Sequence, residues 1–111
     1  MREASPAAME STHTIAPDLR AFDGHFPGAP VLPGAYLLAL VLHEIGRHDA
    51  LRAPSGVALQ VQQVKFLAPV GPGSTLRIHL QPQGDAIAFA VHEGATPVAR
   101  GQVSRSEVPL A

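Results

Sequence analysis

The second half of the chain alternates apolar and polar residues over several short stretches. These stretches contain Leu59 to Phe66, Leu76 to Leu80, Ile87 to Val91, and Val98 to Val103. Successive side chains of a strand point to opposite faces of a sheet, so this alternation predicts four strands with one buried face. An extra residue between Val61 and Val64 interrupts the first stretch and predicts a β-bulge. With turns at Gly84-Asp85 and Glu93-Gly94, the pattern predicts an antiparallel meander.

A helical stretch precedes these strands. Pro33-Gly34 opens it, and we expect the helix to run to about His48. Its first two turns, Ala35 to Leu42, carry no polar stripe, which predicts a helix enclosed by the sheet. Its polar residues gather in the last turns, where we expect solvent, and we interpret Glu44 as a solvated or paired surface acid. The predicted class is α+β, with a curled antiparallel sheet wrapped around one long central helix.

The beginning of the chain lacks such patterns. Residues 1–11 are rich in Ala, Ser and Glu without periodicity, which predicts a disordered tail. Thr12 to Ile15 is a candidate short strand, so we expect a single domain over residues 12–111. A single sheet around one helix leaves long edges uncovered in a domain of this size, which favours association into a dimer or larger assembly.

Composition excludes several classes of function. The net charge is only −1, with 8 Lys and Arg against 9 acids, so nucleic-acid binding is not expected. The chain contains no cysteine, and its 6 histidines are not closely spaced, so we expect no disulfide and no metal site. The apolar run Ala35 to Leu42 is far shorter than the ~20 residues that span a bilayer. With no secretory apolar run in Met1 to Arg20, we expect a cytoplasmic protein without membrane contact.

The segment before the helix is dense in glycine and proline. These residues fix an irregular and stiff backbone over Asp23 to Gly34. The whole stretch Phe22-Asp23-Gly24-His25-Phe26-Pro27-Gly28-Ala29-Pro30-Val31-Leu32-Pro33-Gly34 closely resembles the signature of bacterial 3-hydroxyacyl-ACP dehydratases. Val64 to Gly73 resembles the strand and turn that follow their helix, so the likeness extends from about Thr12 to Val103. The short beginning resembles the compact dehydratase-like proteins of aryl polyene clusters.

The resemblance implies a hotdog fold and dimers whose active sites lie between protomers. It implies dehydration of a 3-hydroxyacyl thioester carried by acyl carrier protein, within fatty acid or polyene synthesis. No metal or redox cofactor is implied. The expected partners are the acyl carrier protein and a second hotdog chain, in a homodimer or a heterodimer.

The resemblance also assigns residues. His25 is the implied base, held by the backbone carbonyl of Val31, and the N–H of Gly34 is the implied donor to the thioester oxygen. The family places Glu or Asp where this chain has Ala39, and usually has glutamine where it has His43. The expected substrate-binding residues surround these groups: Phe26, Pro27, Gly28, Val31, Pro33, Tyr36 and Ala39.

Four interpretations of the missing acid stay open. A partner hotdog chain supplies the carboxylate, or His43 or a water that it holds replaces the acid in a homodimer. In the third interpretation the chain is a non-catalytic acyl-ACP binding or scaffold subunit, and in the fourth it is a thioesterase. A structural role remains the alternative for two of these residues. His43 would then be a hydrogen-bonded helix residue at the end of the core, and Tyr36 a core residue.

Overall fold

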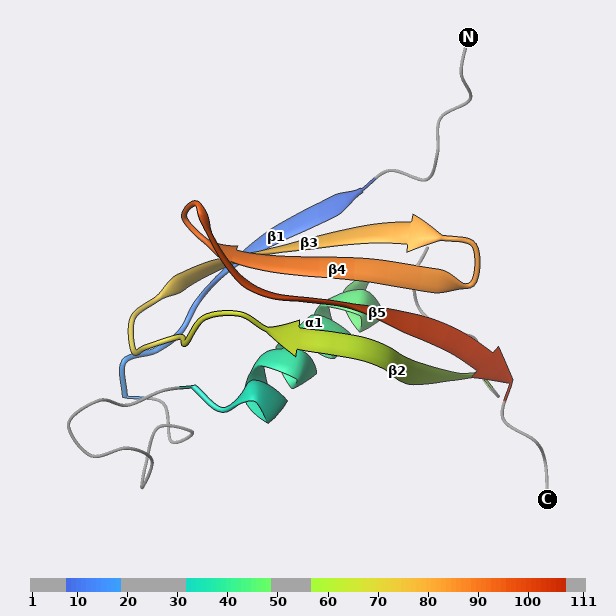
Figure 1. Ribbon diagram of the computed structural model, residues 1–111, viewed down its shortest axis with the longest axis horizontal. Coiled ribbons are helices and arrows are strands. Elements are labelled where there is room, and N and C mark those ends of the chain that lie inside the picture. The colour runs from blue at the N-terminus through green and yellow to red at the C-terminus, as the bar shows by residue number, and fades with distance from the viewer. Residues whose placement is uncertain (1–7, 19–31, 49–56, 108–111) are drawn as a thin grey trace, which may run out of the picture.

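The computed structural model describes residues 8–18, 32–48 and 57–107, and Figure 1 shows their arrangement. One helix and five strands follow one another along the chain. Their order is β1 (Met9–Thr14), α1 (Gly34–Arg47), β2 (Val57–Phe66), β3 (Thr75–Gln83), β4 (Ala86–Glu93) and β5 (Thr96–Glu107). The predicted α+β class, with one helix against an antiparallel sheet, is confirmed.

The five strands form one antiparallel sheet in the order β1-β3-β4-β5-β2. Strands β3, β4 and β5 make the predicted meander, joined by tight turns in which Gly84 and Gly94 have positive φ. The prediction that the first strand of the meander is Leu59 to Phe66 is wrong, because β2 pairs with β5 at the far edge and not with β3. Residues 67–74 then carry the chain from this edge to β3, on the other side of β4 and β5 (Figure 1).

The predicted β-bulge lies in β2. The register with β5 shifts between Val61 and Gln63, where the alternation of the sequence is also interrupted. Beyond the bulge, Val64 lies opposite Gly101, and the ring of Phe89 on β4 packs over this glycine. The glycine therefore provides the space in which the bulged strand and a core aromatic ring meet.

The core lies between the helix and one face of the sheet. Alternate residues of the strands and one stripe of the helix supply it: Ile15, Leu32, Leu37, Val41, Ile45, Val70, Leu76, Ile78, Leu80, Ile87, Phe89, Val91, Val98, Ala99 and Val103. The burial of β3 and β4 alternates residue by residue, as the sequence predicts. No helix in the part of the chain that the structure describes is long and apolar enough to cross a membrane.

The prediction that the sheet encloses the helix is wrong for the single chain. Only Leu37, Val41, Glu44 and Ile45 of α1 are buried, while Ala35, Tyr36 and Ala39 are exposed. One sheet can cover only one side of a helix, and the described residues supply nothing for the other side. The apolar composition of α1 thus exceeds what this chain buries.

The first strand begins earlier than the sequence predicts. The sequence predicts a strand at Thr12 to Ile15 and a tail over residues 1–11, but β1 spans Met9–Thr14, while residues 1–7 lie outside the described residues. Met9 pairs with Leu80 and packs against the core, which extends the strand toward the N-terminus. Pairing with β3 decides this boundary, and the local composition does not reveal it.

Candidate active site

Five of the predicted site residues lie outside the described residues. These are His25, Phe26, Pro27, Gly28 and Val31. The described residues begin again at Leu32 and include the predicted positions Pro33, Gly34, Tyr36, Ala39 and His43. The geometry of the candidate site is therefore that of the helix start and of the helix face that follows it.

Gly34 is the first residue of α1. Pro33 precedes it with φ −61° and ψ 142°, so an extended backbone enters the helix, and no side chain caps this end. The carbonyl of Pro33 accepts bonds from the N–H groups of Tyr36 and Leu37, at 3.0 and 3.2 Å. Among the described residues, nothing accepts a hydrogen bond from the N–H of Gly34. The first turn of α1 contains no acidic residue, so no negative side chain there offsets the positive end of the helix dipole beside this donor.

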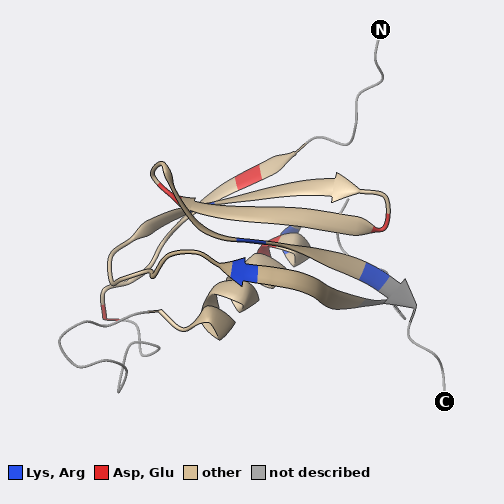
Figure 2. Cartoon of the chain, in the orientation of Figure 1, with Lys and Arg blue, Asp and Glu red and all other residues tan. Residues whose placement is uncertain are grey.

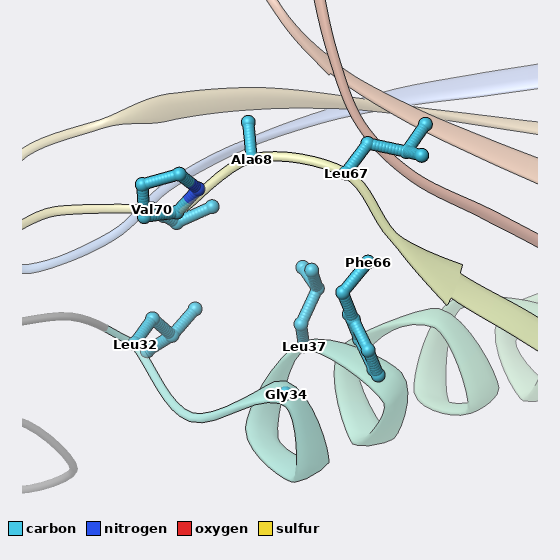
Figure 3. Close-up of a pocket in the computed structure, with 8 residues that line it drawn as sticks. Leu32, Gly34, Leu37, Phe66, Leu67, Ala68 and Val70 are labelled. Atoms are coloured by element: carbon cyan, nitrogen blue, oxygen red, sulfur yellow. The ribbon is translucent and has the colours of Figure 1, made fainter.

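A cavity of about 400 Å³ adjoins this donor. Its lining is almost wholly apolar and comes from the helix start and the segment after β2: Leu32, Gly34, Leu37, Phe66, Leu67, Ala68, Pro69 and Val70 (Figure 3). Such a lining suits an acyl chain or the hydrocarbon part of a thioester. The predicted oxyanion donor and an apolar space therefore occur together.

The ring of Phe66 lies flat against Gly34, as Figure 3 shows. A Cβ atom at position 34 would come within 2.9 Å of Phe66 Cζ. The Phe66 side chain is 50% exposed, so it borders both the cavity and solvent. Any side chain at position 34 would therefore meet this ring.

A second hollow, of about 300 Å³, lies on the uncovered face of α1. Tyr36, Ala39, Leu40 and His43 line it, and their helical spacing places them on one stripe. The structure thus brings together three residues that the sequence singled out, namely the phenol, the alanine in place of the acid, and the histidine. No carboxylate is among these four lining residues.

A buried acid that the sequence analysis misjudged lies on the opposite face of the helix. Glu44 is only 2% exposed, although we predicted a surface acid. Its Oε1 lies 3.0 Å from His13 Nε2 on β1 and 3.4 Å from Arg47 Nη1. His48 Nε2 is 3.3 Å from Oε2 but makes no hydrogen bond to it. The spacing of Leu37, Val41 and Glu44 on one helical stripe was the available signal.

The Glu44 cluster holds β1 against the second half of α1. Burial by itself would raise the pKa of Glu44, but a hydrogen bond from Ser11 and the positive charges of Arg47 and His13 outweigh it and lower the pKa below its usual value. The carboxylate is thus the favoured form in the folded chain. The cluster has a structural role, because it lies between α1 and the sheet and its residues line neither of the two hollows.

Replacing Glu44 is expected to make the chain less stable in a pH-dependent way. Glu44→Gln should lower the free energy of unfolding by about 1–2 kcal/mol at pH 7, because it removes charge-assisted hydrogen bonds. A lowered folded-state pKa stabilises fully above the ordinary glutamate pKa of about 4.3 and less as pH falls through the folded value. Urea denaturation from pH 7 to pH 3 should therefore show the two proteins converging below about pH 4.3.

Glu10→Gln is the matched control. Glu10 forms an ion pair of 3.2 Å with Arg77, and both side chains are about half exposed. An exposed pair contributes at most about 1 kcal/mol, so this variant should stay close to the wild type at every pH. An equal loss in both variants would contradict the role assigned to the buried carboxylate.

Comparison with known proteins decides the family. The sequence model of the ApeI-like family, described as ApeI dehydratase, matches residues 2–102. The chain belongs to the ApeI-like dehydratase family. This match confirms the dehydratase resemblance that the histidine loop indicated. No group of three or more metal-binding side chains occurs within the described ranges.

Curated relatives of this ApeI-like chain include 3-hydroxyacyl-[acyl-carrier-protein] dehydratases named FabZ. The protein of Protochlamydia amoebophila is 39% identical over 66 residues, which cover 57% of this chain and 42% of the relative. That of Methylobacterium sp. is 33% identical over 94 residues, 78% of this chain and 57% of the relative. The chain thus spans only about two fifths to three fifths of these relatives.

Solved structures similar to the ApeI-like chain confirm the hotdog fold. A chain of the dehydratase heterocomplex ApeI:P from Xenorhabdus doucetiae aligns with TM-score 0.71 and 25% identity, covering 96% of this chain and all of that one. The fluoroacetyl-CoA thioesterase FlK aligns with TM-score 0.69 at 15% identity, over 96% of this chain and 88% of that one. The second likeness concerns the fold alone.

Proposed function

We propose that the chain is a subunit of a 3-hydroxyacyl-ACP dehydratase in fatty acid or polyene synthesis, acting in the cytoplasm. The observation that carries the proposal is the N–H of Gly34, which has no acceptor among the described residues and lies beside an apolar cavity at the start of the helix. The family match and the dehydratase relatives support the reaction class. Carrier-bound thioester is the proposed substrate because the FabZ relatives are named for it.

The proposed reaction needs three groups. His25 takes the proton from the carbon next to the thioester carbonyl. The N–H of Gly34 and the helix dipole stabilise the negative charge that develops on the carbonyl oxygen. A third group protonates the hydroxyl as it leaves as water, and Ala39 has no proton to give.

A second hotdog chain is the proposed source of the third group. The stripe of Tyr36, Ala39 and His43 is uncovered in the single chain and hollowed by about 300 Å³. Exposed apolar side chains extend toward the same end of the molecule, with Phe66 at 50% and Leu67 at 45%. A partner that covers this face would bring its own carboxylate to the active site. The related ApeI:P dehydratase is itself a heterocomplex, which supports a hetero-oligomer.

His43 is the second candidate for the third group. It lines the same hollow as Ala39, one helical turn further on. An imidazolium there could protonate the leaving hydroxyl in a homodimer. This version requires no carboxylate from a partner.

Reconstitution tests the proposal. The purified chain is assayed for dehydration of 3-hydroxyacyl-ACP, alone and with the hotdog proteins encoded near it. We expect activity with one such partner and a loss of about 10²- to 10⁴-fold for His25→Ala, the usual contribution of a general base. His43→Ala separates the two sources of the acid, because it should reduce activity only if His43 donates the proton.

Three results would contradict the proposal or one of its assignments. Tight binding of acyl-ACP without turnover, alone and with every partner, would show a non-catalytic scaffold subunit. Release of free 3-hydroxy acid in place of the unsaturated thioester would show a thioesterase. Unchanged dehydration in His25→Ala would refute the assignment of the base.

A further inference from the structure

The outer face of the sheet, opposite to α1, carries two neighbouring cations. Lys65 on β2 and Arg100 on β5 lie directly opposite one another in the antiparallel register, and both side chains are exposed. Paired positions of this kind lie about 5 Å apart at their Cα atoms, so the two side chains can converge on one point. Like charges in this arrangement repel and weaken a sheet. Stability alone therefore does not explain the pair.

A hollow of about 350 Å³ is lined by these two cations together with small residues of the neighbouring strands. Ala88 and Ala90 on β4 form the floor, because they alternate with the buried residues of that strand. Gln63 and Gln102, which also lie opposite one another on β2 and β5, add two side-chain amides to the rim. The hollow thus combines two positive charges and two amide donors around a space that large side chains leave open.

No carboxylate neutralises this pair within the described residues. Neither Lys65 nor Arg100 makes an ion pair or a side-chain hydrogen bond there. Arg77, on the same face of the sheet, is by contrast paired with Glu10 at 3.2 Å. Figure 2 shows Lys and Arg positions on β2 and β5, and an acidic position on β1, at the other edge of the sheet.

We propose that Lys65 and Arg100, with Gln63 and Gln102, bind the phosphate group of the pantetheine arm that carries the acyl thioester. The proposal deepens the proposed function and rests on it. A phosphate offers several acceptor oxygens in one compact group, which suits two cations and two amides that converge on one hollow. Both a carrier-linked arm and coenzyme A contain this group, so the site by itself accepts either source.

The position of Lys65 connects this hollow with the candidate active site. Lys65 immediately precedes Phe66, and successive strand residues point to opposite faces. Phe66 lies on Gly34 at the inner side, while Lys65 borders the phosphate hollow at the outer side. Beyond the end of β2, Leu67 and Ala68 still donate hydrogen bonds to the carbonyl of Val98, so an arm with its phosphate in the hollow would have to pass round the edge of β2 that faces away from β5.

The test compares pantetheine and 4′-phosphopantetheine, which differ only in the phosphate. Binding of each to the chain, in complex with its partner where one is found, is measured by calorimetry at low and physiological salt. We expect phosphopantetheine to bind about tenfold more tightly at low salt, as charge-assisted hydrogen bonds contribute on this scale. The double variant Lys65→Gln/Arg100→Gln should lose this preference and keep its affinity for pantetheine. Arg77→Gln, on the same face, is the control and should keep the preference.

Two further probes, coenzyme A and phosphopantetheine-loaded carrier protein, distinguish the sources of the phosphate. A loss of affinity in the double variant for phosphopantetheine and for both probes supports a site open to either source. A loss for phosphopantetheine and the carrier protein, with coenzyme A unaffected, assigns the carrier. Equal binding of pantetheine and phosphopantetheine by the wild type overturns the proposal, even where dehydration is observed. A double variant weakened only toward the carrier protein, with phosphopantetheine unaffected, overturns it as well. Absence of dehydration with an intact phosphate preference refutes the proposed function instead.

Discussion

Ala39→Glu is expected to raise the dehydration rate of the chain without a partner by about 10²- to 10⁴-fold, the usual contribution of a general acid. The substitution places a carboxyl group at the position where the resemblance to the dehydratases implies Glu or Asp. Residue 39 is exposed and lines the hollow with Tyr36 and His43, so the new side chain has room. Glutamate is also a good helix former, and the fold should tolerate it. The measurement is the rate of unsaturated thioester formation by the chain alone.

Ala39→Gln is the matched control for this gain. Glutamine has nearly the same size and fills the same hollow, but it cannot donate a proton as a carboxylic acid does. It should leave the rate unchanged. A gain with glutamine, or no gain with glutamate while a partner complex is active, would show that the carboxyl group at position 39 is not what the chain lacks.

Gly101→Ala is expected to destabilise the chain by about 3 kcal/mol, the upper range for overpacking a core. A Cβ atom at this position would overlap the backbone carbonyl oxygen of Gln63 and lie 2.7 Å from Phe89 Cζ. The backbone at the β2 bulge cannot withdraw without breaking its pairing with β5. The Phe89 ring is 4% exposed and belongs to the core cluster, so displacing it would disturb the packing of its neighbours. Urea denaturation should show the loss as a lower midpoint.

Gly46→Ala provides a control with the opposite sign. Gly46 lies inside α1, and a Cβ atom there would meet nothing within 4 Å. Alanine in a helix is favoured over glycine by about 1 kcal/mol, so this variant should be more stable than the wild type. Destabilisation by both substitutions, or by neither, would contradict the packing described for Gly101.

The elements that sequence reasoning predicted well are those with a local cause. Alternation around Ile78 and Phe89 fixed two strands, Pro33-Gly34 marked the helix start, and the extra residue before Val64 marked the bulge. The position of β2 beside β5 was not predicted, because pairing between distant strands leaves no local pattern. The exposure of the helix face around Ala39 was also missed. The sequence pattern of an apolar helix is the same whether its own sheet or another chain covers the helix.

The sequence predicted those positions of the candidate site that lie in or near the family motif. The sequence indicated Gly34, Ala39 and His43 as site positions, and the structure places the last two in one hollow and the first beside the apolar cavity. The sequence could not indicate that Phe66 lies on Gly34 or that Lys65 faces Arg100. Both depend on how β2 is placed in three dimensions, and residues far apart along the chain meet there.

The edge position of β2 has a consequence for how this chain has to be made. Within the described residues β2 pairs on one side only. Exposed apolar side chains lie on it, Val61 at 37% and Phe66 at 50%, and Leu67 directly after it is 45% exposed. Long apolar edges template aggregation, and a charged gatekeeper is a common safeguard. Lys65 is the single charged residue of β2. We therefore expect a chain produced without the proposed partner to aggregate more readily than one produced together with it.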